Sequence, residues 1–262
     1  MATRFELVLH GENGVALRAA GEEALAEIQR LDAQLSLYRP TSEIAHLNAL
    51  AAERAVRVEP SLFRLLQQAG RLSRETNGGF DITIGPLMRC WGFMGGSGEM
   101  ADESAVAEAR SKVGMNLVEL NENDFTVRFS RRGVMLDLGA IGKGYALERA
   151  AEILRENGIA SALLHGGTST VCAIGAPPET PAWNIAIANP ATHFLAASEP
   201  RENVPSEERP LVVVPLKDHA LSVSAVWGKS FSSAGRILGH VLDPRTGAPV
   251  QQALAAAVIV PS

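Results

Sequence analysis

Cysteine is scarce in this 262-residue chain, which contains two such residues, Cys90 and Cys172. Two cysteines so far apart are no disulfide framework, and neither stands in the spacing of a metal-binding motif. We therefore expect both to be small, buried hydrophobic residues. The patterns Gly-x-Ser-x-Gly and His-Glu-x-x-His do not occur either, so the sequence carries no serine hydrolase elbow and no zinc protease motif.

Long apolar runs and clusters of positive charge are also missing. No apolar run approaches the roughly 20 residues that a membrane-spanning helix needs, and the first residues do not open a signal peptide. We therefore expect a soluble protein, either cytoplasmic or the mature part of an exported one. The 24 Lys and Arg residues form no block and are outnumbered by 29 Asp and Glu residues, so we expect no nucleic-acid partner.

Hydrophobic residues make up 46% of the chain, enough for a sizeable core. Apolar residues at helical spacing and helix-end signals predict helices over 22–35, 43–50, 60–76, 102–114 and 145–157. Short apolar runs between turn residues predict strands over 5–9, 117–120, 125–129, 134–136, 161–164, 171–175, 183–188, 211–216, 220–224 and 255–260. We expect an antiparallel meander within 117–136 and a hairpin of 211–216 with 220–224.

Helices and strands alternate without regular β-α-β units, which indicates an α+β fold with mixed, mostly antiparallel sheets and packed helices. We see no internal repeat and no clear linker, so we expect a single domain over 1–262. The segment 196–210 is polar and rich in Glu and Pro, and we interpret it as an exposed insertion.

A glycine-rich segment, Asp137-Leu138-Gly139-Ala140-Ile141-Gly142-Lys143-Gly144, lies between a predicted strand and a predicted helix. Glycine lets main chain approach a bulky anion, a helix N-terminus attracts negative charge, and the lysine adds a full positive charge. The segment suits a phosphate or pyrophosphate, although its glycine spacing is that of neither a Walker loop nor a dinucleotide fingerprint. An ordinary tight turn is the alternative.

Three further segments have a functional and a structural interpretation. His165-Gly166-Gly167-Thr168-Ser169-Thr170 is either bare backbone for a ligand or a β-turn. In Gly239-His240-Val241-Leu242-Asp243-Pro244-Arg245-Thr246-Gly247, the His and Asp either transfer protons or are structural, with Asp243 capping its own turn. In 76–93, Asp81 either caps or binds, and Trp91 and Phe93 either stack on a ring system or pack in the core.

Taken together, these segments resemble the ApbE-type FAD:protein FMN transferases, a family formerly labelled thiamine-biosynthesis lipoproteins. The match runs through nearly the whole chain, and its parts are Met1-Ala2-Thr3, Leu35 to Glu43, Asn48, Gly79-Phe80-Asp81, Gly85-Pro86-Leu87, Trp91-Gly92-Phe93, Asp137 to Tyr145, Gly166-Gly167 and His240 to Gly247 with Pro249. The pair Asp-Leu-Gly-x-Ile-x-Lys-Gly and His-x-x-Asp-Pro-x-Thr-Gly is specific to the family.

The resemblance implies an enzyme that binds FAD and Mg²⁺, attaches FMN to a threonine hydroxyl of an acceptor flavoprotein and releases AMP. Such phosphoryl-type transfer depends on positioning and charge neutralisation. The resemblance implies catalytic roles for His240 and Thr246, and a backbone carbonyl of Ala140 or Gly142 on the metal. The residues it implies around the flavin nucleotide are Tyr38, Asp81, Gly139, Lys143, Glu148, Gly166, Gly167 and His240.

The sequence also departs from the family pattern. Thr168 stands where the family has Asp after its glycine pair, and Val223-Ser224-Ala225 stands where it has Thr-Ser-Gly. The chain ends at Val260-Pro261-Ser262, whereas family members continue into an Asp-x-x-x-Thr segment that supplies the other metal ligands. We therefore expect a truncation, with those ligands beyond Ser262.

Three alternatives to the transferase stay open from the sequence. An FAD pyrophosphatase would use the same site with water in place of the threonine hydroxyl. A flavin-binding protein without catalysis fits the changed residues, and an unrelated α+β domain with chance glycines is the fourth interpretation.

Overall fold

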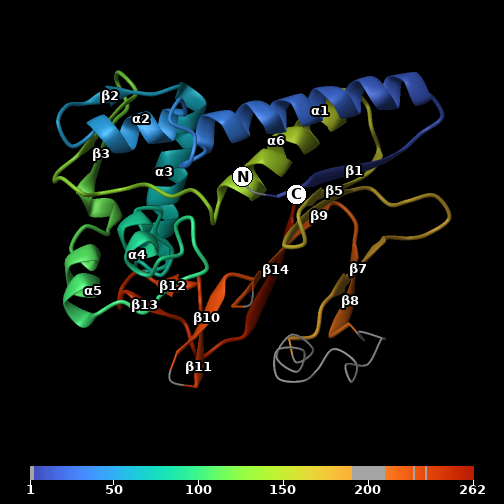
Figure 1. Cartoon of the computed structure of the whole chain (residues 1–262). Helices are drawn as coiled ribbons and strands as arrows, with labels where there is room; N and C mark the ends of the chain where they lie inside the picture. The colour runs from blue at the N-terminus through green and yellow to red at the C-terminus, as the bar shows by residue number, and fades with distance from the viewer. Residues whose placement is uncertain (1–2, 191–209, 227, 234) are drawn as a thin grey trace. The chain divides into compact units, whose positions relative to one another are not determined.

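The computed structural model describes residues 3–190, 210–226, 228–233 and 235–262 (Figure 1). These residues divide into two compact units. Unit 1 comprises Asp32–Gly142 and Gly228–Ala253, and unit 2 comprises Ala2–Leu31, Lys143–Trp227 and Leu254–Ser262. The expected insertion over 196–210 lies outside the described residues except for Pro210, and the expected single domain over 1–262 stays a prediction.

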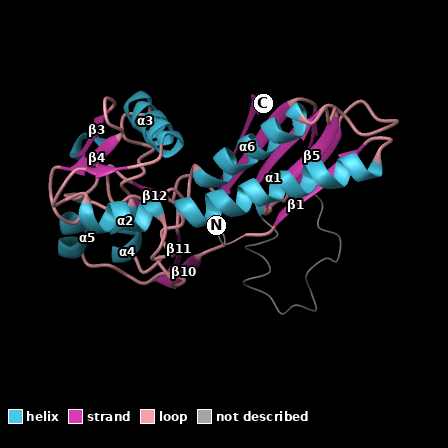
Figure 2. Cartoon of the chain, turned by 90° about the horizontal axis from the view of Figure 1, so that it is seen from above, coloured by secondary structure: helices cyan, strands magenta, loops and turns pink. Residues whose placement is uncertain are grey.

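Unit 2 is built on a five-stranded antiparallel sheet with the order β1-β5-β6-β9-β14. Its strands are β1 (Phe5–His10), β5 (Ser161–Gly166), β6 (Thr170–Ile174), β9 (His219–Ala225) and β14 (Ala255–Pro261). Two helices, α1 (Gly14–Leu35) and α6 (Gly142–Glu156), lie along one face of this sheet (Figure 2). A second antiparallel pair, β7 (Trp183–Ile187) and β8 (Val212–Leu216), belongs to the same unit.

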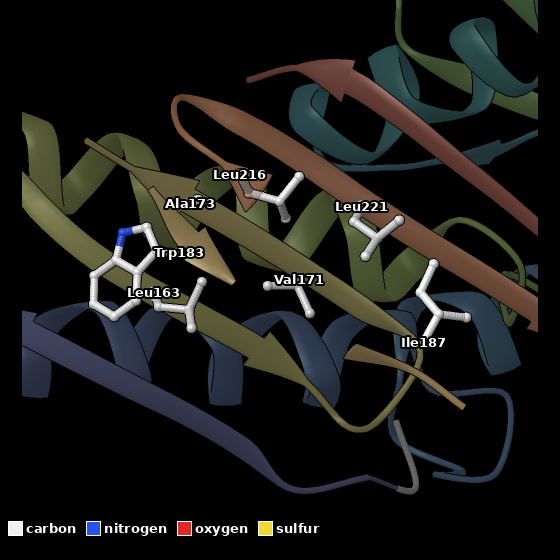
Figure 3. Close-up of a cluster of buried hydrophobic side chains, with 7 residues drawn as sticks. All are labelled: Leu163, Val171, Ala173, Trp183, Ile187, Leu216 and Leu221. Carbon is white, nitrogen blue, oxygen red and sulfur yellow. The ribbon is translucent and has the colours of Figure 1, made fainter. Parts of the chain in front are cut away.

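The sheet of unit 2 is buried on both faces near β5 and β6. Leu163, Val171, Ala173 and Leu221 form one cluster with Trp183, Ile187 and Leu216 of the β7–β8 pair (Figure 3). Because strand neighbours point to opposite faces, the buried Ala162 and Leu164 turn to the helix side. This explains why β5 is apolar throughout its middle rather than alternating.

Unit 1 combines short helices with small sheets. Its helices are α2 (Glu43–Leu50), α3 (Pro60–Glu75), α4 (Gly85–Cys90) and α5 (Glu103–Arg110), with a 3₁₀ turn over Met115–Leu117. One antiparallel sheet has the order β2-β4-β3, formed by β2 (Val56–Arg57), β4 (Thr126–Phe129) and β3 (Val118–Asn121). The second part of unit 1, Gly228–Ala253, is called the return segment here. It adds two antiparallel strand pairs, β10 (Ser230–Ser233) with β11 (Arg236–Gly239) and β12 (Leu242–Asp243) with β13 (Ala248–Pro249).

Local signals determine where the helices of unit 1 begin. The Ser42 and Asp102 side chains accept hydrogen bonds from the N–H groups of Ala45 and Ala105, which caps α2 and α5. Pro60 occupies the first turn of α3, where its missing N–H costs nothing. A cluster of Leu87, Trp91, Phe93, Ala109, Leu238 and Leu242 then joins α4 and α5 to the return segment.

The mixture of helices and antiparallel strands confirms the predicted α+β class. Two strand predictions are wrong. Residues 134–136 form no strand, because Met135 makes only a single parallel bridge to Ile84, and the third strand beside β3 and β4 is β2. The predicted hairpin of 211–216 with 220–224 is also wrong, because β8 pairs with β7 while β9 pairs with β6 and β14.

Other differences concern element ends and short elements. α1 begins at Gly14 and α6 at Gly142, both earlier than the pattern predicts, and α5 ends at Arg110. Helix α4 and the strand pairs β10–β11 and β12–β13 have no counterpart in the sequence prediction. They are two to six residues long, too short for a hydrophobic period to be recognised.

Candidate functional site

The first half of the glycine-rich segment belongs to unit 1 and is folded on itself. The Asp137 N–H donates to the Ile82 carbonyl at 2.7 Å, and the Asp137 carboxylate accepts from the Gly139 N–H at 2.8 Å. The Leu138 carbonyl accepts from the N–H groups of Ile141 and Gly142, at 3.1 and 2.7 Å. Gly139 and Ala140 are exposed, so their main chain is accessible to a ligand.

Asp137 is a partly buried carboxyl group whose pKa depends on its surroundings. Burial raises the pKa of its carboxyl group, while the Gly139 N–H and the positive charge of Lys229 act in the opposite direction. Burial also raises the pKa of Tyr38, and the negative charge of Asp137 adds to that effect. The side chain of Tyr38 is nevertheless 62% exposed. Asp137 is therefore close enough to Tyr38 to affect its pKa, and Lys229 is close enough to Asp137 to affect the pKa of that carboxyl group.

His240 is held against the main chain of Lys229. Its main-chain nitrogen and its Nδ1 lie 3.0 and 3.2 Å from the Lys229 carbonyl oxygen. The rings of Phe93 and His240 meet edge to face, with their centroids 6.4 Å apart. Donation from Nδ1 selects the tautomer that keeps its basic lone pair on Nε2. The Nζ of Lys229 donates back to the Phe93 carbonyl at 3.4 Å.

The rest of the His segment is structural in its contacts. The Asp243 carboxylate accepts from the N–H of Arg245 and pairs with both ends of its guanidinium group, at 2.7 to 2.9 Å. Asp243 therefore caps its own turn, as the structural interpretation holds. Thr246 is exposed, with its hydroxyl 3.3 Å from the Ala248 N–H.

Two alternatives in the 76–93 region are decided by burial and contacts. Trp91 and Phe93 are 7% and 1% exposed and belong to the core cluster, and Trp91 Nε1 donates to the Gly247 carbonyl at 2.8 Å. Core packing is therefore the correct interpretation of both aromatic residues.

Asp81 is 8% exposed and holds three segments of unit 1 together. It accepts from the Ser73 hydroxyl, from the hydroxyl and N–H of Thr83, and from the Met115 N–H, at 2.6 to 3.0 Å. Four donors satisfy the buried carboxylate. This arrangement positions the loop around Asp81; a contact of Asp81 with flavin stays a prediction.

A separate group of the predicted residues belongs to unit 2. Lys143 lies in the first turn of α6, and its Nζ donates to the Ser169 hydroxyl at 2.7 Å. Burial lowers the pKa of Lys143. Ser169 lies in the β5–β6 turn, which begins at Gly167 directly after Gly166, the last residue of β5. The structure therefore connects Lys143 to the turn that contains Gly167.

The glycine pair is closely packed against the start of the chain. Gly167 has φ +68° and its N–H donates to the Arg4 carbonyl at 2.9 Å. A Cβ atom there would lie 2.2 Å from Thr3 Oγ1. Glycine is required at this position by both its backbone conformation and its neighbour.

The remaining unit 2 positions are either exposed or packed against the core. Glu148 and Thr168 are exposed. Val223, a predicted departure from the family pattern, packs partly buried against the core cluster, and its N–H donates to the Ser169 carbonyl at 2.8 Å. A hollow at the start of α1, lined by Glu12, Asn13, Gly14, Val15 and Arg18, contains none of the predicted residues.

Sequence reasoning did not single out Lys229, and it did not predict that Ser169 accepts a hydrogen bond from Lys143 or that Asn48 bonds to the main chain of Leu136. Asn48 belongs to the family match, but no local pattern predicts its contact with a residue 88 positions away. Among the described residues, no group of three or more His, Cys, Asp or Glu side chains is placed to hold a metal ion. Within the same part of the chain, no helix is long and apolar enough to cross a membrane.

Comparison with known proteins decides the family. The model of the ApbE family matches residues 1–262. This chain belongs to the ApbE family. The family prediction from the sequence motifs is therefore confirmed over the whole chain.

Relatives with the name FAD:protein FMN transferase occur in several bacteria. One from Klebsiella pneumoniae is 25% identical over 99% of this chain, one from Treponema pallidum 28% over 89%, and one from Rhodobacter capsulatus 29% over 98%. The chain spans 71, 64 and 46% of the lengths of these relatives, respectively. Their shared name confirms the predicted transferase class for the family.

Solved structures show the same fold. The ApbE protein of Thermotoga maritima matches with a TM-score of 0.83 at 23% identity, covering 98% of this chain and 82% of that one. The flavinyl transferase ApbE of Pseudomonas stutzeri matches with a TM-score of 0.78 at 26% identity, covering 98 and 80%. The ApbE flavin transferase fold is therefore confirmed.

Proposed function

We propose that this chain transfers FMN from FAD to a threonine hydroxyl of an acceptor flavoprotein and releases AMP, with Mg²⁺ as the required ion. The name shared by its relatives supports flavin transfer. The structural observation that supports it most directly is the hydrogen bond from Lys143 to Ser169, at the start of a helix and beside a glycine pair.

This arrangement suits a phosphate group for a physical reason. The ammonium group of Lys143 is partly buried, and burial disfavours its charged form. An anionic phosphate beside the ammonium group would favour its charged form, because it supplies the opposite charge. Gly144, beside Lys143, has nothing within 4 Å of the position of a Cβ atom, so a ligand can approach its main chain closely.

The transfer needs a base for the acceptor hydroxyl. In the proposed reaction, the threonine oxygen forms a bond to the phosphorus of FMN, and the bond from that phosphorus to the oxygen that leaves with AMP breaks. We assign acceptance of the hydroxyl proton to Nε2 of His240, the nitrogen that stays basic when Nδ1 donates to Lys229. Thr246, six residues later in the same segment, is proposed to assist.

The described residues fit Mg²⁺ only as an ion carried mainly by the substrate phosphates. They offer no cluster of three or more acidic or His side chains, whereas the exposed main chain at Ala140 offers oxygen. Mg²⁺ commonly keeps several waters and binds substrate phosphates with few protein ligands. We propose that a carbonyl of Ala140 or Gly142 contacts it, and that the bound ion neutralises phosphate charge.

The remaining predicted contacts with FAD, at Tyr38, Gly139, Glu148, Gly166 and Gly167, are part of the same proposal. The relevant experiment mixes the chain with FAD, Mg²⁺ and a tagged acceptor carrying a flavinylation threonine. Intact mass should show the acceptor gaining the mass of FMN, with AMP released in equal amount. An acceptor whose threonine is replaced by valine should gain nothing.

Two other results would reject the proposal in different ways. FMN and AMP released without any gain of acceptor mass would identify an FAD pyrophosphatase. Bound FAD with no product would identify a flavin-binding protein without catalysis.

A further inference from the structure

Asn48 connects helix α2 to the residue that precedes the glycine-rich loop. Its amide nitrogen donates to the Leu136 carbonyl at 3.0 Å, and its amide oxygen accepts from the Leu136 N–H at 2.8 Å. The two residues are 88 positions apart in the sequence. One side chain therefore satisfies both main-chain polar groups of a residue that is fully buried.

The segment 134–137 needs such a partner because, within the described residues, main chain pairs with it along one edge and not along the other. Met135 bridges to Ile84, and the Asp137 N–H donates to the Ile82 carbonyl, so one edge of the segment is paired. Leu136 lies between these positions and turns its main-chain groups to the other edge. There Asn48 takes the place of a neighbouring strand. Without it, two buried main-chain groups would lose their hydrogen-bond partner, which is unfavourable.

Asn48 itself is fixed by α2. Ser42 caps this helix, and Ile44 and Leu47 are fully buried on it. From Leu136 the chain continues through Asp137 to the loop whose internal hydrogen bonds involve Gly139, Ile141 and Gly142. The hydrogen bonds from Asn48 to Leu136, together with those inside the loop, therefore fix the loop relative to α2.

We propose that Asn48 is a positioning residue that holds the loop 137–142 in the conformation that binds the phosphates of the flavin nucleotide. This inference rests on the proposed function for its ligand. The contact with Leu136 accounts for an amide at this position, since only a side chain with one donor and one acceptor can serve both main-chain groups.

Two substitutions separate this role from general stability. Asn48→Asp keeps the shape and the acceptor for the Leu136 N–H, but places a carboxylate oxygen against the Leu136 carbonyl. Asn48→Ala removes both hydrogen bonds without adding charge. Asn121→Asp is the matched control, because its exposed side-chain oxygen accepts from the Asn123 N–H and an aspartate does the same.

Amide hydrogen exchange of the folded chain, with and without FAD, is the main measurement. In the wild type, FAD should protect 137–142. In both Asn48 variants, exchange within 136–142 without FAD should be at least about tenfold faster, as expected for lost buried hydrogen bonds, while exchange in α3 stays unchanged. FAD protection of the loop should be lost, and the Kd for FAD should rise at least about tenfold.

Each other outcome is decisive. Unchanged loop exchange in both Asn48 variants would overturn the inference, as would acceleration throughout unit 1, which would mean a merely structural role. Faster loop exchange with full FAD protection would also overturn it. A wild-type chain that FAD does not protect would contradict the proposed function, while exchange without FAD would still decide whether Asn48 holds the loop.

Discussion

Replacement of Gly167 by alanine tests how tightly the glycine pair of the β5–β6 turn is constrained. The residue has φ +68°, and an added Cβ would lie 2.2 Å from Thr3 Oγ1. Both features oppose a side chain. The expected result is a folded but destabilised chain with weaker binding of FAD.

The magnitude follows from two separate costs. An alanine in left-handed backbone conformation costs roughly 1–2 kcal/mol. Relief of the contact requires Thr3 to leave its rotamer, because Oγ1 ends a short side chain, and this costs roughly 0.5–1.5 kcal/mol. The free energy of unfolding should therefore fall by about 1.5–3.5 kcal/mol, within the range that a domain of about 5–15 kcal/mol tolerates.

Urea unfolding of four variants separates the two costs. Gly158→Ala is the matched control, because Gly158 has φ +74° with nothing within 4 Å of its Cβ position, so only the conformational cost remains. Thr3→Ala removes the contacting oxygen. In a double-mutant cycle, Gly167→Ala with Thr3→Ala should recover roughly 0.5–1.5 kcal/mol of the loss.

Certain results would refute this reasoning. If Gly167→Ala costs no more than Gly158→Ala, or if Thr3→Ala recovers nothing, the contact with Thr3 does not constrain the turn. Unchanged affinity for FAD in the Gly167→Ala variant would separate this turn from the proposed binding site.

Three further predictions concern charge and packing. Burial raises the pKa of Asp137 above its usual 3.8, so folding favours the protonated form of this carboxyl group. Asp137→Asn should therefore raise the free energy of unfolding at pH 7. The difference from the wild type should vanish below about pH 3.8, as measured by urea unfolding across pH. Burial lowers the pKa of Lys143 below its usual 10.5. The affinity of the wild type for FAD, measured by titration, should therefore fall as pH rises through that lowered pKa. Lys143→Met should bind FAD at least about tenfold more weakly at pH 7, and its affinity should not fall over the same pH range. Gly175→Ala should cost roughly 3 kcal/mol or more, well above Gly158→Ala in the same unfolding assay, because its Cβ would lie 2.1 Å from the Ala160 carbonyl oxygen, which is main chain and cannot rotate away. A Lys143→Met variant with the wild-type pH profile, an Asp137→Asn variant less stable at pH 7, or equal losses for the two glycine variants would contradict these expectations.

The sequence alone determined the features that depend on a few consecutive residues. Ser42 and Asp102 cap α2 and α5, and Pro60 occupies the first turn of α3. Such helix starts can be predicted locally, because a cap acts on N–H groups within three residues of itself. The α+β class and the family followed from element order and from motifs that are contiguous in the chain. Lys143 and the glycine pair were recognised in the same way.

Tertiary structure decided which distant segments meet. The apolar run of β8 predicts a strand, but it does not predict which strand pairs with it. In the structure β8 pairs with β7 rather than with β9, and both β7 and β8 contribute side chains to the core cluster of unit 2. Likewise, nothing near Asn48 or Ser169 in the sequence predicts that they bind Leu136 and Lys143. Such hydrogen bonds form only when folding returns the chain to the same place, because their strength depends on distance and burial and not on separation along the chain.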